Sequence, residues 1–190
     1  MRHPLSQACH AGKPHGQGAR QFARFQGVPH QCRLQVRERV VKRTLTFRHV
    51  YPVDPDRLFE LVTDLDTLEA VTKPWMRFDH LPSGPVREGQ VIDVDMSLFG
   101  LFPARPYKIV VTKCAGSQHV MTSDETGMGS HLVHMLEVHP SGEGSAELVD
   151  RIEVEAGWAA PLVAMWLWLT HRWRHHVRLR LLRRLAEQPE

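Results

Sequence analysis

Two titratable residues, His134 and Asp150, stand in predicted strands at positions that alternate in step with apolar side chains. In HLVHMLEVH (131–139), His134 has the parity of the apolar residues, and in AELVDRIEVE (146–155) Asp150 does. Successive side chains of a strand point to opposite faces of a sheet. Both polar groups are therefore predicted to face the same apolar interior.

The PSGEG turn between these segments predicts how they pair. If residue 139 lies opposite residue 145, His134 faces Asp150 directly, with about 5 Å between the Cβ atoms. A slip of one residue would expose the apolar face, so only even slips compete. A carboxylate beside an imidazole on an apolar wall fixes the tautomer and raises the pKa of the ring, which suits a general base or an anchor for a ligand's polar end. The alternative is that the two side chains only hydrogen-bond to each other within the sheet and have a structural role.

Other catalytic and cofactor signatures are missing from the sequence. It contains no nucleophile elbow, phosphate loop, paired catalytic carboxylates or HExxH segment, and TGMGSH lacks the spacing of a nucleotide site. The Cys and His residues at positions 9–32 match no zinc framework. We therefore expect neither a metal nor a cofactor.

The elements that must position His134 and Asp150 can be traced along the chain. RTLTFRHVY (43–51) alternates like a half-buried strand, and Asp54 with Pro55 predicts the start of a helix. Asp66 and Glu69 resemble a capping box that opens a second short helix. Turns rich in Gly, Pro and Ser then separate six predicted strands, which span 75–81, 90–99, 105–113, 118–124, 131–139 and 146–155. This order predicts an α+β fold with an antiparallel sheet.

A long C-terminal helix follows, in which apolar residues recur at spacings of three and four. They are Leu162, Trp166, Leu169, Trp173 and Val177. The spacing predicts one face packed on a core. The apolar run 158–169 is too short for the about 20 residues of a membrane span, and the arginines fall all round the helix rather than on one phosphate-binding face. We expect no transmembrane segment and no nucleic-acid partner.

Residues 43–186 resemble the START-like or SRPBCC superfamily, the polyketide cyclase-like proteins with the helix-grip fold. The resemblance rests on the order of elements and on VDPDRLFELVTDLDTLEAVT, REGQVIDVDM and HLVHMLEVHPSGEGSAELVDRIEVE. It implies a curved antiparallel sheet of about seven strands wrapped around the C-terminal helix, with two short helices after the first strand. It also implies a mainly apolar cavity that binds a hydrophobic or amphipathic small molecule, such as a lipid.

The residues predicted to contact that ligand come from the sheet and the long helix. They are Met76, Phe78, His80, Val94, Met96, Leu98, Tyr107, Ile109, Leu132, Leu136, Ile152, Leu162, Trp166, Leu169 and Trp173. The apolar SLFGLFP turn (97–103) is predicted either to form a lip that touches a membrane transiently during loading or to fold against the helices.

Three functions remain open at this point. The first is a non-catalytic carrier or sensor of a hydrophobic ligand. The second is a cyclase, dehydratase or hydrolase that uses His134 and Asp150. The third is a protein-interaction module whose core is filled by its own side chains.

Composition predicts two regions. Residues 1–38 carry six Lys and Arg against one acidic residue and show no strand or helix period, which favours a disordered basic extension or a start codon assigned too far upstream. Residues 39–190 form the predicted ligand-binding domain, whose part from 39 to 157 has twelve basic and eighteen acidic side chains. Three cysteines and the lack of an apolar secretory signal favour a reducing, cytoplasmic location.

Overall fold

The structure is a computed structural model that describes residues 42–186 of the 190-residue chain. The predicted basic extension over 1–38 lies outside these residues. The elements are β1 (Lys42–Tyr51), α1 (Pro55–Val62), α2 (Leu65–Thr72), β2 (Met76–Asp79), β3 (Val91–Leu98), β4 (Arg105–Ala115), β5 (Val120–Gly127), β6 (Ser130–Gly142), β7 (Ser145–Glu155) and α3 (Ala160–Ala186). Short 3₁₀ turns precede β5 and α3.

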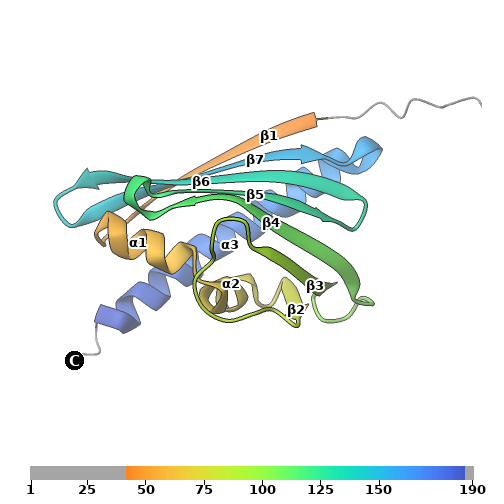
Figure 1. The fold of residues 1–190 in the computed structure, drawn as a ribbon, viewed down its shortest axis with the longest axis horizontal. Helices are drawn as coiled ribbons and strands as arrows, with labels where there is room; N and C mark the ends of the chain where they lie inside the picture. The colour runs from red at the N-terminus through yellow and green to blue at the C-terminus, as the bar shows by residue number, and fades with distance from the viewer. Residues whose placement is uncertain (1–41, 187–190) are drawn as a thin grey trace, which may run out of the picture. The chain divides into compact units, whose positions relative to one another are not determined.

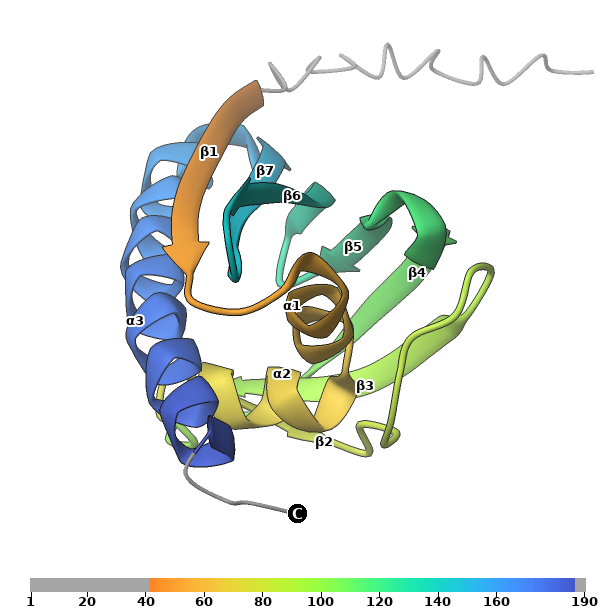
Figure 2. The same cartoon turned by 90° about the vertical axis from the view of Figure 1, so that its left-hand side faces the viewer.

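The seven strands form one antiparallel sheet in the order β1-β7-β6-β5-β4-β3-β2 (Figure 1). Figure 2 shows the sheet curling from β1 round to β2, with α3 running along the open side between these two edges. Helix α3 contacts β1, β7 and α2, while α1 contacts β6 and β7. The predicted α+β fold is confirmed, including the two short helices after the first strand and the long helix of 27 residues at the end.

Local sequence explains where the short helices begin. Pro55 occupies the first turn of α1, where its fixed φ suits a helix start. The capping box predicted at Asp66 is wrong, because α2 begins two residues earlier with Asp64 as its N-cap. The Asp64 carboxylate accepts a hydrogen bond from the Thr67 amide at 2.8 Å, and Asp66 instead accepts one from the Gly84 amide at 3.1 Å.

The hairpin of β6 and β7 differs from the predicted register by two residues. His134 lies opposite Ile152 rather than Asp150, and Asp150 lies opposite Leu136. The strands continue beyond position 139 to pair Gly142 with Ser145, and the register shifts between Pro140 and Gly142. The turn is therefore shorter than predicted, and together with the register shift near Pro140 it displaces the pairing of the two strands by two residues. The slip is even, so both polar side chains keep the predicted inward face.

Helix α3 is rotated by roughly a third of a turn from the predicted orientation. The stripe that includes Leu162 and Trp173 was predicted to be inward, yet Leu162 is 57% exposed and the other members are only half-buried. The buried positions are instead Ala160, Ala164, Leu167, Thr170, His171, Arg174, Arg178 and Leu182. A face of the helix that combines small or apolar residues with polar ones therefore lies toward the sheet.

Apolar clusters pack between the sheet and the helices at three places in the described part of the chain. One joins α1 to β6 and β7, a second joins α2 to β2, β3 and β4, and the third joins β1 and β7 to the beginning of α3. Within residues 42–186, no helix combines the length and apolar character needed to cross a membrane. Together the clusters hold the sheet edges and α3 around a central space.

Candidate ligand-binding cavity

A cavity of about 340 Å³ lies between the sheet and α3. One side, here called the apolar wall, comes from α2, β2 and β3 and consists of Leu65, Leu68, Met76, Phe78, Ile92 and Met96. On the other side, β5, β6 and α3 contribute apolar residues such as Leu132 and Leu136 together with a group of polar residues, here called the polar wall, which consists of Glu125, His134, His171, Arg174 and Arg178. The cavity thus combines the mainly apolar lining and few placed polar groups that small-molecule sites share.

Most residues predicted to contact a ligand line this cavity. They are Met76, Phe78, Met96, Leu98, Tyr107, Ile109, Leu132, Leu136, Ile152, Leu162 and Trp166. His134 lines it as well, whereas Asp150 is buried behind it and makes contact with His134. The alternating pattern of the strands correctly placed these sheet residues on the concave face.

Four predicted contact residues lie outside the cavity wall. Val94 is buried in the apolar cluster beneath the wall, and His80 follows the end of β2, where its backbone has a φ of 68°. Leu169 and Trp173 lie on the half-buried side of α3, and the Trp173 indole donates a hydrogen bond to the Lys73 carbonyl at 2.7 Å. Leu162 and Trp166, on the same stripe nearer the start of α3, do line the cavity, so only the later turns of the stripe lie away from it.

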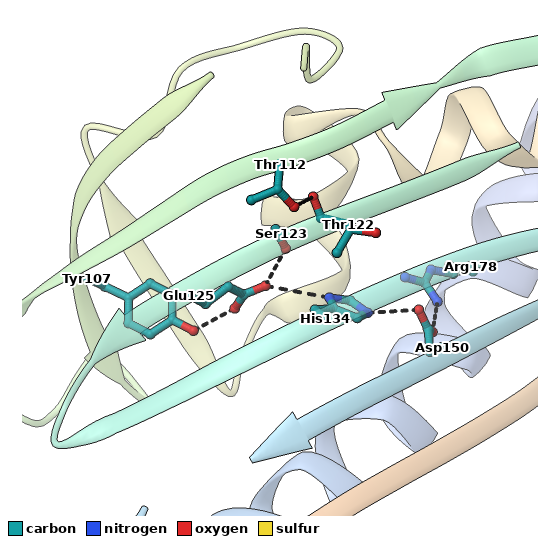
Figure 3. A network of polar contacts seen from close by, with 8 residues as sticks. All are labelled: Tyr107, Thr112, Thr122, Ser123, Glu125, His134, Asp150 and Arg178. Carbon is teal, nitrogen blue, oxygen red and sulfur yellow. Dashed lines mark hydrogen bonds and ion pairs between the residues drawn. The ribbon is translucent and has the colours of Figure 1, made fainter. Parts of the chain in front are cut away.

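Polar contacts run across four neighbouring strands to α3 (Figure 3). Tyr107 donates a hydrogen bond to Glu125 Oε2 at 2.6 Å, and His134 Nδ1 lies 3.5 Å from Glu125 Oε1. His134 Nε2 lies 3.0 Å from Asp150 Oδ1, and Arg178 Nη1 lies 3.6 Å from Asp150 Oδ2. Positive and negative groups alternate along this chain of contacts, so each buried charge has an opposite neighbour.

The surroundings shift the pKa values of this network strongly. Burial disfavours the charged form of His134, but hydrogen bonds with Asp150 and Glu125 outweigh that effect and raise its pKa to about 9. Burial likewise works against the Glu125 carboxylate, yet His134 and Tyr107 lower its pKa to about 2. The pKa of Asp150 is also held well below its usual range, despite burial, by His134 and Arg178. All three groups are therefore charged near neutral pH.

These contacts determine what His134 can do chemically. As an imidazolium it donates its Nε2–H to Asp150 and forms an ion pair with Glu125 through Nδ1–H. It has no free lone pair with which to accept a proton from a ligand. The geometry therefore favours a role in holding Glu125 and Asp150 in place over the role of general base.

Three members of the polar wall were missed by the sequence analysis. His171, Arg174 and Arg178 are each at least nine-tenths buried and line the cavity from successive turns of α3. The imidazole of His171 donates from Nδ1 to the Leu167 carbonyl at 2.9 Å, and burial together with Arg174 lowers its pKa to about 3. Their spacing of three and four residues could have predicted a buried face of α3. It was not used because charged residues are seldom buried, and the apolar stripe, which has the same spacing, was taken as the buried face instead.

One group of side chains has the spacing of a metal site. His134, Asp150 and His171 each offer an atom, and these atoms lie within 4.8 Å of one another. However, Arg178 already pairs with Asp150, and a cation would have to displace it and the proton of His134. The positive charge around this group favours an anion over a metal ion.

The apolar turn between β3 and β4 combines the two predicted arrangements. Phe99 packs against Trp75 and Trp166, with ring centroids 5.6 Å and 5.1 Å apart. Leu101 and Phe102 are instead 84% and 58% exposed. Leu98 and Trp166 line the cavity, so this turn, here called the lip, connects the cavity wall to an exposed apolar surface.

Solved structures share this architecture. The aromatase/cyclase Zhui from Streptomyces sp. R1128 superposes with a TM-score of 0.61 at 12% identity, over 77% of this chain and 96% of that one. Norcoclaurine synthase from Thalictrum flavum, solved with dopamine and hydroxybenzaldehyde, gives 0.58 at 12% identity over 80% and 91%. A protein from Rhodobacter sphaeroides gives 0.60 at 17% identity over 73% and 91%.

The chain has the START-like helix-grip fold. No protein-family model and no curated protein sequence matches the chain. The neighbours with this fold include proteins named as a cyclase and as a synthase that holds small aromatic molecules. The predicted fold and its resemblance are thereby confirmed.

Proposed function

We propose that this protein binds a hydrophobic or amphipathic small molecule in the cavity between the sheet and α3. The observation that carries the proposal is a cavity of about 340 Å³ with a continuous apolar wall on one side and buried charges on the other. That volume lies in the range of about 300–1,000 Å³ that small-molecule sites occupy. A carrier or a sensor would use such a site.

The same observation argues against a module whose core is filled. The inward side chains of β2, β3 and β4 form one cluster with α2, and Trp166 of α3 packs against it, yet a space of about 340 Å³ remains between these side chains and α3. Protein interiors are close-packed, and voids much larger than a water molecule are few. A space of this size is therefore better explained by a ligand than by imperfect packing.

An enzymatic role through His134 and Asp150 is less well supported. Both ring nitrogens of His134 already contact carboxylates, and Asp150 is 1% exposed. A general acid or base must reach the proton that it transfers. Binding without turnover is therefore the function that this geometry supports best.

The test of the proposal is uptake of the fluorescent apolar probe N-phenyl-1-naphthylamine. We expect the probe's emission to rise and saturate with the purified full chain, because transfer into the cavity removes it from water. Native mass spectrometry followed by organic extraction should also reveal a copurified apolar molecule. Failure of the probe to bind, together with the absence of any copurified molecule, would overturn the proposal.

A matched pair of variants locates the bound probe. Leu132 on β6 lines the cavity, whereas Met135 on the same strand is exposed. In Leu132→Trp the indole fills space that the probe needs, so we expect at least about tenfold weaker binding. Met135→Trp should leave binding unchanged. Equal effects of the two substitutions would place the probe outside the cavity.

A further inference from the structure

The polar wall contains buried polar groups of α3 that the protein itself does not fully pair. His171, Arg174 and Arg178 lie one turn apart on the buried side of α3 and line the cavity. Within the described residues, the donors Arg174 Nε and Arg178 Nε and the acceptor Nε2 of the neutral His171 ring lack hydrogen-bond partners. Buried polar groups are nearly always paired, so unpaired ones in a cavity wall point to a missing partner.

The two arginines differ in their surroundings. Arg178 faces Asp150, with 3.6 Å between Nη1 and Oδ2. For Arg174, no ion pair with another residue of the range 42–186 is found, although its side chain is only 9% exposed. A buried charge without a partner is strongly destabilising. Arg174 is thus the place where an opposite charge would be most favourable.

Counting the charges of the network gives the same result. His134, Arg174 and Arg178 are positive near neutral pH, whereas Glu125 and Asp150 are negative. The buried network therefore carries a surplus of one positive charge. Burial and the neighbouring Arg178 lower the pKa of Arg174, against the opposing effect of the charges on Glu125 and Asp150.

We infer that the ligand is an amphipathic monoanion whose carboxylate pairs with Arg174 while its apolar body lies against the apolar wall. This inference rests on the proposed function, since it specifies the chemistry of the molecule that the cavity binds. An arginine fork holds a carboxylate through two parallel hydrogen bonds, which fixes the orientation of the ligand as well as its charge. The opposite side of the cavity then accepts the hydrocarbon by shape alone.

The test compares ligands that share a chain and differ in the head group. Decanoate, decanol and decylamine are titrated near neutral pH against the protein with bound N-phenyl-1-naphthylamine, and loss of the probe's emission is measured. We expect decanoate to displace the probe at a concentration at least about tenfold lower than decanol does. The reason is that a charge-assisted hydrogen bond at a buried site contributes at least that factor to affinity. Decylamine should be the weakest of the three.

Variants of two arginines on the same helix assign the effect to Arg174. We expect Arg174→Gln to remove the preference for decanoate over decanol and Arg174→Lys to keep most of it. Arg172 is exposed and lies over the Trp168 ring, so Arg172→Gln should keep the full preference. Circular dichroism and melting temperature confirm that each variant is folded before displacement is measured.

The outcomes separate this inference from the proposed function. If the neutral probe binds and decanol displaces it as well as decanoate does, the inference is wrong while the proposed function stands. If decanoate is preferred and Arg172→Gln abolishes the preference as fully as Arg174→Gln does, surface charge is responsible and the inference is again wrong. If the neutral probe does not bind at all, the proposed function fails first.

Discussion

The two walls of the cavity are held together by different interactions, hydrophobic packing in one and charge pairing in the other. The apolar wall consists of six side chains that belong to one hydrophobic cluster and attract one another through dispersion. The polar wall consists of charged or titratable groups, and all of them except Arg174 are oriented by a hydrogen bond or an ion pair. Removing a methyl group from the apolar wall enlarges the cavity slightly, whereas removing a charge from the polar wall leaves a buried opposite charge unpaired.

This difference has a functional consequence. An apolar surface tolerates ligands of various shapes, because hydrophobic burial is not directional. A fixed array of charges discriminates between ligands, because an unmatched polar group in a buried site is costly. The apolar wall should therefore contribute affinity and the polar wall should contribute orientation and choice of ligand.

The largest expected effect comes from breaking the polar wall at Asp150. Asp150→Asn keeps the shape of the side chain but removes the charge that pairs with His134 and Arg178. Because two buried cations lose their shared partner, we expect the free energy of unfolding to fall by about 4 kcal/mol. Urea unfolding near neutral pH measures it.

The control for this substitution is an exposed carboxylate in an ion pair. Asp93 on β3 pairs with Lys108 and is 67% exposed at its side chain. Asp93→Asn should change the free energy of unfolding by less than about 1 kcal/mol. Similar losses in the two variants would show that the Asp150 network contributes no more than a surface pair.

The next effect is a dependence of stability on pH that belongs to the polar wall alone. The pKa of His134 rises from 6.5 to about 9 in the folded chain. The folded state then binds more protons than the unfolded state between these values, so this contribution is complete below pH 6.5 and is lost as the pH rises through about 9. The expected loss is on the order of 3 kcal/mol.

His134→Gln should abolish this alkaline loss, and the measurement is the difference between the unfolding free energies of the two proteins across that pH range. Met96→Ala in the apolar wall serves as the control, because it lowers stability without changing a titratable group. Its curve should run parallel to that of the natural sequence. A pH dependence that persists in His134→Gln would contradict the assignment to this imidazole.

The sequence predicted the sheet side of the cavity better than the helix side. A strand has only two faces, so one parity decision placed Leu132, His134 and Asp150 correctly, even though the register was off by two residues. The slip arose near Pro140, where the strands continue beyond the turn that Gly and Ser residues had marked. An error in register did not alter which side chains face inward.

A helix offers a continuous range of orientations, and here the apolar pattern indicated the wrong one. The partner of the buried Arg178 is Asp150 on β7, and the nearby negative charge that acts on Arg174 is Glu125 on β5, both far away in the sequence. Periodicity within one helix contains no information about charges on other elements. Trp166 and Trp173, two members of the predicted apolar stripe of α3, instead contact Trp75 at the edge of the sheet.

The smallest expected effect on stability, and the one that tests how a ligand reaches the apolar wall, lies at the lip. Leu101 is 84% exposed, so Leu101→Ser should change the free energy of unfolding by less than about 0.5 kcal/mol and leave the affinity for N-phenyl-1-naphthylamine unchanged. If the lip touches a membrane during loading, the substitution should nevertheless slow transfer of the probe from phosphatidylcholine vesicles, since less apolar surface reaches the bilayer. Stopped-flow fluorescence measures the transfer rate. The control is Val91→Ser, which changes an exposed residue on the outer face of β3 and should leave that rate unchanged. Equal rates in the natural sequence, Leu101→Ser and Val91→Ser would mean that the probe enters from water without contact between the lip and the membrane.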